Sequence, residues 1–218
     1  MKIKWYGHAA FKITTDKGIR IIIDPYESGA YDGALAYGKI DEEADIVLTS
    51  HDHADHNYVE TISGKYVLVN KAGEYDVRGI KIKAFPTFHD NSAGKERGGN
   101  LIFVIGVDDL ILVHTGDIGH ALEPDLLKKI GKTDIVLLPV GGFFTIDAAE
   151  ASKMTDSLAS RVTIPMHYKT EKCAFPIAPV EAFTKNKNNV RVLDKSEIDL
   201  KKENLPEKPE VIVLRHAL

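Results

Sequence analysis

One short stretch constrains this chain more than any other. In TSHDHADH, from Thr49 to His56, three histidines and two aspartates occupy five of the last six positions. Histidines of globular proteins usually stand singly, because each ring needs its own hydrogen-bond partner or access to water. Neutral imidazole nitrogens and carboxylate oxygens are ligands for zinc, iron and manganese. The stretch therefore predicts a metal site in preference to a polar surface loop.

Composition sets the outer limits. The chain has 218 residues, of which 44% are hydrophobic, so we expect one domain spanning residues 1–218. A formal net charge of -4 provides no basic field for gripping long nucleic acids, which are not the expected partner. The single cysteine, Cys173, excludes an internal disulfide, and no segment resembles a signal peptide or a membrane span. These features favour a cytoplasmic protein that does not bind membranes.

Apolar runs separated by turns predict strands in both halves of the chain. A hairpin is expected first, with Asp16-Lys17-Gly18 at its turn and a second arm that ends at Asp24. Further strands are predicted at Ile46–Thr49, Tyr66–Val69, Ile80–Phe85, Leu101–Val107, Leu110–His114, Ile135–Pro139, Val162–Met166, Val190–Leu193 and Val211–Arg215.

Helices are predicted between the later strands. One follows Pro124, a second begins at Asp147 with a capping box completed by Glu150, and a third follows Pro179. The polar run at 194–210 is expected to be an exposed connection. Strands in both halves with helices interposed in the second predict two packed sheets covered by helices.

Three more ligand-type residues follow later strands. The full set, in chain order, is His51, His53, Asp55, His56, His89 in PTFHD, Asp117 in VHTGD and His167 in IPMHY. This HxHxDH motif after a strand, with the three later residues in this order, resembles the metal-binding signature of the metallo-β-lactamase superfamily. The resemblance runs nearly from end to end. The segments WYGHAAFKI and LLPVGGFFTIDAAEA resemble, more narrowly, the ascorbate-6-phosphate-lactonase-like branch of metal-dependent hydrolases.

The resemblance implies an α+β fold, a four-layer αββα sandwich with its site on loops at one edge of the sheets. It also implies one or two divalent metal ions, with zinc as the default and manganese or iron as alternatives. One ion would be held by His51, His53 and His89, a second by Asp55, His56 and His167, and Asp117 would bridge them. Each of these side chains also stands at or just beyond a predicted strand end, where loops can converge.

The expected chemistry is hydrolysis. Zinc-bound water reaches a pKa of about 7, against about 15.7 for free water, so hydroxide is available at neutral pH. We expect a metal-bound hydroxide to attack a small ester, lactone or phosphodiester, which is an anionic or carbonyl-containing substrate. Asp55 and Asp117 are the predicted catalytic residues, and Asp55 could accept or relay a proton if the second metal position is vacant.

Two other functions remain open. A nuclease of the same fold should carry a basic surface or an additional substrate-binding segment, and neither is apparent in the sequence. A non-catalytic, metal-stabilised binding protein is disfavoured, because structural zinc sites are usually closed four-ligand cages. A di-iron flavoprotein is disfavoured as well, since such relatives typically carry glutamate where this chain has His53. A homo-oligomer is compatible with the sequence.

Several residues near the motifs have two interpretations each. Asp24 is predicted to orient a metal-binding histidine through a hydrogen bond, in preference to serving as a turn residue. His8 either faces the site and binds substrate or packs inside with one satisfied nitrogen. His120 is a candidate substrate-binding residue because of its loop position, whereas His114 is expected to be an ordinary strand residue.

The segment DNSAGKERGGN after His89 carries two cations. Lys95 and Arg97 could bind a phosphate or carboxylate of the substrate, or could belong to a flexible charged loop. The sequence favours the loop slightly, because Glu96 lies between the cations. Phe143 and Phe144 could form an aromatic wall or pack in the core.

Overall fold

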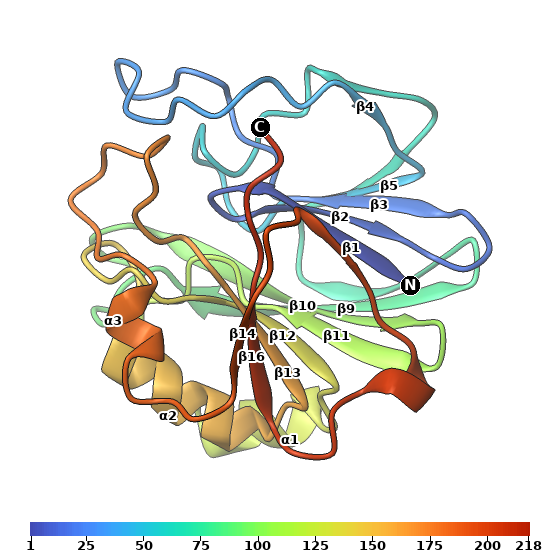
Figure 1. The fold of residues 1–218 in the computed structure, drawn as a ribbon. Coiled ribbons are helices and arrows are strands. Elements are labelled where there is room, and N and C mark those ends of the chain that lie inside the picture. The colour runs from blue at the N-terminus through green and yellow to red at the C-terminus, as the bar shows by residue number, and fades with distance from the viewer.

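The computed structural model describes residues 1–218 and is built from two β-sheets that pack face to face (Figure 1). The first sheet runs, from edge to edge, β15 (Glu197–Asp199), β1 (Lys2–Gly7), β2 (Ala10–Thr14), β3 (Arg20–Ile23), β5 (Ile46–Leu48) and β7 (Val67–Val69). The second runs β14 (Val190–Val192), β16 (Glu210–Val213), β13 (Val162–Met166), β12 (Ile135–Pro139), β11 (Leu110–His114), β10 (Gly99–Val107), β9 (Ile80–Phe88) and β8 (Gly73–Val77). A short pair, β4 (Glu42–Glu43) and β6 (Ile62–Ser63), stands outside both sheets.

Three helices lie on the outer side of the eight-stranded sheet, as Figure 1 shows: α1 (Pro124–Ile130), α2 (Ala148–Leu158) and α3 (Glu181–Thr184). The predicted capping box is present, because Asp147 accepts the backbone N–H groups of Ala149 and Glu150 while Glu150 accepts that of Asp147. None of the helices is long and apolar enough to cross a membrane. The predicted α+β sandwich class is confirmed.

The outer face of the six-stranded sheet differs from the expected four-layer arrangement. Loops cover it where a second helical layer was expected (Figure 1). In the loop after β3, Gly29, Gly33 and Tyr31 all have positive φ, and such residues interrupt a regular helix. Side chains from the loops, including Tyr26 and Tyr37, pack against residues of the sheet and form with them a second buried cluster of 13 residues. Apolar packing therefore replaces the helices on this side.

The burial pattern of the eight-stranded sheet follows its covering. Along β9 from Ile80 to Ala84, buried and exposed residues alternate, as expected for a strand with one face in solvent. Every residue of β12 and β13 is buried, because helices cover the outer face there and the main core covers the inner face. The main core contains 44 buried residues drawn from both sheets. It fixes the strand ends from which the candidate site is built.

Most predicted elements are confirmed, three of them to the residue: β11, β12 and β13. The predicted hairpin is also present, with Phe11 opposite Ile23. Strands β1, β4, β6, β8 and β15 were not expected. β15 lies within the polar run predicted to be a connection, and it pairs with β1 through Ile3 and Ile198. Its sequence carries little apolar signal because two of its three residues are exposed.

Candidate metal centre

The predicted ligands converge on loops that leave four strand ends. The HxHxDH motif follows β5, His89 directly follows β9, Asp117 lies three residues after β11, and His167 directly follows β13. These strands belong to both sheets, so the site lies at one edge of the sandwich. Because the strand ends are held by the core, the loops have fixed bases.

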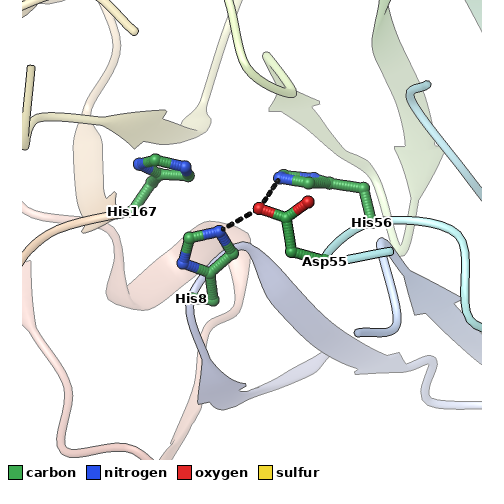
Figure 2. Close-up of side chains that lie close together, drawn as sticks. All are labelled: His8, Asp55, His56 and His167. Atoms are coloured by element: carbon green, nitrogen blue, oxygen red, sulfur yellow. Dashed lines mark hydrogen bonds and ion pairs between the residues drawn. The ribbon is translucent and has the colours of Figure 1, made fainter. Parts of the chain in front are cut away.

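Three groups of side chains have donor atoms close enough to hold a cation, with all atoms of a group within 4.8 Å of one another. The first group is His51, His53 and His89, the same three residues that the resemblance assigns to one metal. The second contains the three residues assigned to the other metal, joined by His8 (Figure 2). The third is His51, His56 and Asp117. Asp117 therefore lies between the two expected positions.

The carboxylate of Asp117 is the point on which the histidines converge. Its Oδ2 lies 3.1 Å from His56 Nε2, 3.0 Å from His89 Nε2 and 3.2 Å from His167 Nε2. His56 Nε2 nevertheless makes no hydrogen bond, and neither does the other oxygen of Asp117, Oδ1. Buried polar atoms without partners are costly, and here they gather at one place.

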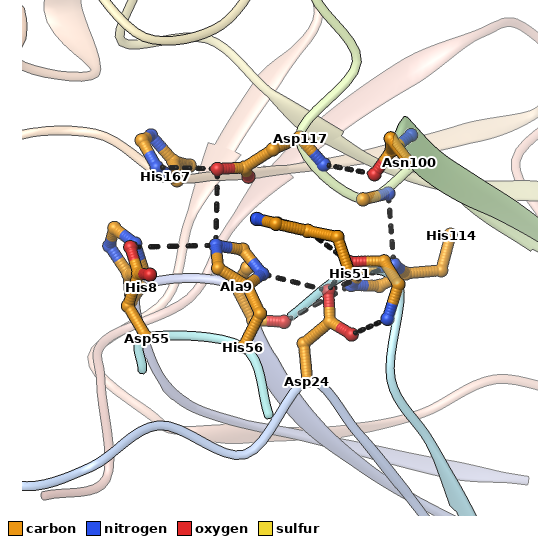
Figure 3. A network of polar contacts seen from close by, with 12 residues as sticks. His8, Ala9, Asp24, His51, Asp55, His56, Asn100, His114, Asp117 and His167 are labelled. Carbon is orange, nitrogen blue, oxygen red and sulfur yellow. Dashed lines mark hydrogen bonds and ion pairs between the residues drawn. The ribbon is translucent and has the colours of Figure 1, made fainter. Parts of the chain in front are cut away.

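Asp24 and Ser50 orient His51 and His56; Figure 3 labels Asp24 and the two histidines. The Asp24 carboxylate accepts the backbone N–H of Ser50 at 2.7 Å and the hydroxyl of Ser50 at 2.7 Å. It also lies 2.9 Å from His56 Nδ1, which must be the donor because an ionised carboxylate only accepts. Since the Ser50 hydrogen goes to Asp24, its oxygen accepts from His51 Nδ1 at 2.9 Å.

This arrangement leaves the Nε2 atom of His51 and that of His56 directed into the site. His51 Nε2 is buried and has no hydrogen-bond partner. Burial, followed by the neighbouring His56, lowers the pKa of His51 to about 3, so its ring is neutral near pH 7. A neutral ring with Nδ1 engaged offers the lone pair of Nε2 to a metal. The geometry matches the role predicted for Asp24 and adds Ser50 to it.

The charge balance of the site calls for a cation. Asp24, Asp55 and Asp117 are only 0%, 6% and 2% exposed. All of their ion-pair partners are histidines, with no lysine or arginine among them. Burial opposes ionisation of Asp117, but His167 and His56 outweigh it and hold its pKa well below the usual value. Buried carboxylates persist only with such compensation, which a divalent ion also provides.

His8 adjoins the donor cluster, but it packs inside the protein with one satisfied nitrogen, as in the second of its two interpretations. It is fully buried, and its Nε2 lies 3.0 Å from Asp55 Oδ2 (Figure 2). Its Nδ1 has no partner, and its ring centroid is 4.1 Å from that of His167. Burial and His167 lower the pKa of His8 to about 4. His8 does not line the cavity described next, so it contacts Asp55 and His167 instead.

The donor atoms open into a cavity of about 380 Å³. Arg97 and Phe144 line it, whereas Lys95 does not, and Phe143 is 64% exposed. The complete lining is Tyr31, His53, Asp55, His89, Glu96, Arg97, Asp117, Phe144, His167 and Phe175. The structure thus separates the two cations and the two phenylalanines that the sequence could not distinguish.

Two other histidines lie outside the cavity. His120 accepts the backbone N–H of Phe88 with Nε2, and its Nδ1 contacts the carbonyl oxygen of Ala121 at 2.8 Å. The structure does not bring this candidate substrate-binding residue to the donor cluster. His114 donates from Nε2 to the carbonyl oxygen of Ala9 and accepts from Gly116 N at Nδ1. It is the buried strand residue that was expected.

Sequence reasoning missed several residues that shape the site. The Tyr31 hydroxyl donates to Asp55 Oδ1 at 2.9 Å, although Tyr31 stands in a glycine-rich loop without any motif. Asn100 accepts the backbone N–H of Asp117 and thereby fixes the start of that loop. Phe175 follows the last histidine motif at a distance that carries no signal. Only Ser50, which adjoins the HxHxDH motif, could have been found from its position.

Comparisons with known proteins identify the family. A family model described as a β-lactamase superfamily domain matches residues 2–167. A metal-dependent hydrolase of Thermococcus onnurineus is 35% identical over 196 residues, which cover 78% of this chain and 85% of that protein. Another, from Methanopyrus kandleri, is 30% identical over 198 residues, with the same coverage of 78% and 85%.

Solved structures extend the comparison. A crystal structure from Thermotoga maritima, of a proposed Zn-dependent hydrolase of the metallo-β-lactamase superfamily, has a TM-score of 0.82 and 33% identity and covers 98% of this chain and 97% of that one. The short form of human tRNase Z has a TM-score of 0.58 at 10% identity, covers 82% of this chain and 97% of its own, and shows the fold alone. The narrower resemblance to ascorbate-6-phosphate lactonases stays a prediction. The chain belongs to the metallo-β-lactamase superfamily and is one of its metal-dependent hydrolases.

Proposed function

We propose that this metal-dependent hydrolase cleaves a small ester, lactone or phosphodiester at a dinuclear metal centre that opens into the cavity. One observation carries the proposal. Three buried carboxylates face a set of histidines, with no lysine or arginine to neutralise them, and unpartnered donor atoms remain at the floor of the cavity. A pair of divalent cations fits this donor set in charge and in ligand type.

The proposed ligands fall into two sets joined by one carboxylate. Asp117 is proposed as the bridge, because its Oδ2 lies within 3.2 Å of histidines from both sets. Zinc is the first candidate, and manganese and iron use the same ligands. The first set would be His51, His53 and His89, and the second would be Asp55, His56 and His167.

Several side chains of this protein orient the proposed ligands and hold protons near the reacting water. When bound, such ions lower the pKa of coordinated water to about 7 and polarise carbonyl or phosphoryl oxygens. Asp24 holds His56 directly and His51 through Ser50, which keeps both rings aimed at the site. Asp55 faces the cavity and is placed to take up a proton.

Two donors stabilise Asp55 as an anion. The Tyr31 hydroxyl bonds to Oδ1 and His8 Nε2 to Oδ2, at 2.9 Å and 3.0 Å. Burial favours the neutral acid, but His56 and His8 outweigh it and lower the pKa of Asp55. If the second metal position is vacant, an ionised Asp55 can accept a proton from the nucleophile and return it to the leaving group.

The cavity favours a small substrate over a polynucleotide. Its volume of about 380 Å³ lies within the roughly 300–1,000 Å³ usual for small-molecule sites. Three aromatic side chains and a single cation line it, and the whole chain has a formal net charge of -4. A nuclease would need cations along the path of a phosphate backbone.

The test combines metal analysis with a substrate screen. Purified protein is assayed for bound metal and for turnover of lactones, esters, phosphodiesters and short RNA, before and after chelation. His51→Ala and His53→Ala should each lower metal content, because each removes a ligand nitrogen. His120→Ala is the matched control, since His120 lies outside the cavity and should leave the metal content unchanged.

The outcomes separate the alternatives. Metal-dependent turnover of a small ester, lactone or phosphodiester supports the proposal, whereas turnover of RNA alone supports the nuclease. Full metal loading in both histidine variants would reject the ligand assignment. Tightly bound metal without turnover of any substrate in the screen would instead favour a metal-stabilised binding protein.

A further inference from the structure

We propose that Arg97 binds an anionic group of the substrate, either a carboxylate or a phosphate. A flat or apolar portion of the substrate lies between this group and the bond that is cleaved. The inference rests on the proposed function for the position of that bond. It adds a chemical class to the substrate: an anionic ester or lactone whose charge lies on the side away from the metal centre.

Asp90 organises this loop from within. Its carboxylate accepts four backbone N–H groups, from Ser92 at 2.7 Å, Gly94 at 2.9 Å, Glu96 at 3.1 Å and Arg97 at 2.8 Å. One buried side chain therefore fixes the path of the backbone up to Arg97. This arrangement is not the flexible charged loop that the sequence slightly favoured.

The loop is also tied to the metal centre. The backbone N–H of His89, a proposed ligand, donates to the carbonyl oxygen of Gly98 and closes the base of the loop. The turn carrying Asp117 packs against the same point, because a Cβ on Gly119 would lie 2.4 Å from the backbone nitrogen of Asp90. Arg97 thus has a defined position relative to both His89 and Asp117.

The guanidinium of Arg97 lines the cavity and has its donors free. It makes no hydrogen bond to the protein, and its nearest acid, Glu96 Oε2, is 3.7 Å away, beyond hydrogen-bond distance. The side chain is 33% exposed. A planar guanidinium with five free donors suits the bidentate binding of a carboxylate or phosphate.

A series of neighbouring aromatic rings connects Arg97 with the carboxylate of Asp55 along the cavity. The guanidinium carbon is 5.9 Å from the ring centroid of Phe144, which lies 5.5 Å from that of Phe175. The Phe175 centroid is in turn 5.4 Å from that of Tyr31, whose hydroxyl reaches Asp55. The rings come from three different loops and all line the cavity. They offer a continuous surface to a flat or hydrocarbon group.

Glu96 could in principle select a cationic substrate, but the geometry favours an anion. Its Oε1 already accepts the hydroxyl of Ser92 at 2.6 Å, and its side chain is 60% exposed. A carboxylate in such a position is well solvated and contributes little binding energy. Arg97 lies over the ring of Phe144, and its one acidic neighbour, Glu96, is 3.7 Å away and makes no hydrogen bond to it.

The test measures binding and does not depend on turnover. Metal-loaded protein is titrated calorimetrically with benzoate, benzene-1,4-dicarboxylate and 4-phosphonobenzoate, which share one ring and one carboxylate. Both dianions should bind about 10–100-fold more tightly than benzoate, since a hydrogen bond to a charged group contributes about 1.5–3 kcal/mol. The two dianions distinguish a carboxylate site from a phosphate site.

Arg97→Met should abolish this gain, and Arg97→Lys should keep part of it as a point charge. Lys95→Met is the matched control, because Lys95 belongs to the same loop but does not line the cavity. Equal affinity for benzoate and both dianions in the wild-type protein would overturn the proposal. So would a preference that persists in Arg97→Met, or failure of all dianions to bind. Metal content and turnover of these variants test the proposed function separately.

Discussion

The negative charge of Asp90 and those of the buried aspartates at the metal centre are compensated in different ways. Asp90 meets only backbone N–H groups, and although burial opposes ionisation, these four bonds lower its pKa to about 2. Asp24, Asp55 and Asp117 meet mainly histidines, and Asp117 keeps an unpartnered oxygen. The first arrangement is complete within the chain, whereas the second calls for an added cation. One builds the loop that presents Arg97, and the other builds the metal centre.

The largest effect is expected for Asp117→Asn, which removes an anion from the point where both histidine sets converge. Metal affinity at both positions should fall by more than about 100-fold, beyond the 10–100-fold typical of residues that only orient ligands. Turnover should drop further than thermal stability. Competition with a chromophoric chelator and turnover, measured on matched folded samples, provide the check. An Asn variant that is fully active with two tightly bound metals would defeat the bridging role.

Asp24→Asn should have the second-largest effect, because Asp24 binds no metal in the proposal but holds His56 and Ser50. Metal affinity should fall by about 10–100-fold. Asp134→Asn is the matched control, since Asp134 is equally buried and bonds to Ile111 N and Lys132 away from the site. If both variants lose metal to the same extent, a general loss of folding explains the result.

Ser50→Ala should have a smaller effect, about tenfold in metal affinity, because it removes the hydroxyl that orients His51 and one of the three bonds to Asp24. Asp24 retains its bonds to the backbone N–H of residue 50 and to His56. The same chelator competition measures it. A loss as large as that of Asp24→Asn would show that Asp24 acts mainly through Ser50.

Asp90→Asn should affect metal affinity least, because the Asp90 carboxylate contacts backbone N–H groups and no histidine. It should instead destabilise the loop and remove the preference for dianions. The folded pKa of about 2 is below the unfolded value of about 3.9, so the stabilisation is complete above about pH 4 and is lost as pH falls through 2. Thermal unfolding of the wild-type protein and of Asp90→Asn, both treated with a chelator, measures this difference in stability between pH 2 and 6. If the difference in stability between the two proteins does not decrease toward pH 2, the role of the Asp90 carboxylate is wrong.

The order of the four effects tests the comparison itself. If Asp90→Asn released metal as readily as Asp24→Asn, the two sets of aspartates would not be independent. If Asp117→Asn lost no more metal than Ser50→Ala, the cluster would not need its central charge.

Much of the candidate site could be predicted because its residues lie close in sequence or directly follow strands. His51, His53 and His56 belong to one short loop after β5, so they lie close together because they are close in the sequence. His167 directly follows β13, an apolar strand whose end was predicted to the residue. The strand before His89 was predicted only as far as Phe85, whereas β9 continues to Phe88. Tyr31 and Phe175 carried no such mark, because each stands in irregular chain and reaches the cavity only through packing.

The sequence by itself determined the kind of donors present, the strands that carry them and the family signature, because these depend on residue types and short spacings. Only the tertiary structure decided which of two chemically similar residues reaches the site. Arg97 lines the cavity and Lys95 does not, and His8 joins the cluster whereas His120 stays outside. Those differences depend on how loops from two sheets meet and on which polar atoms the packing leaves without partners. Local sequence does not encode either, because the contacts join residues far apart in the chain.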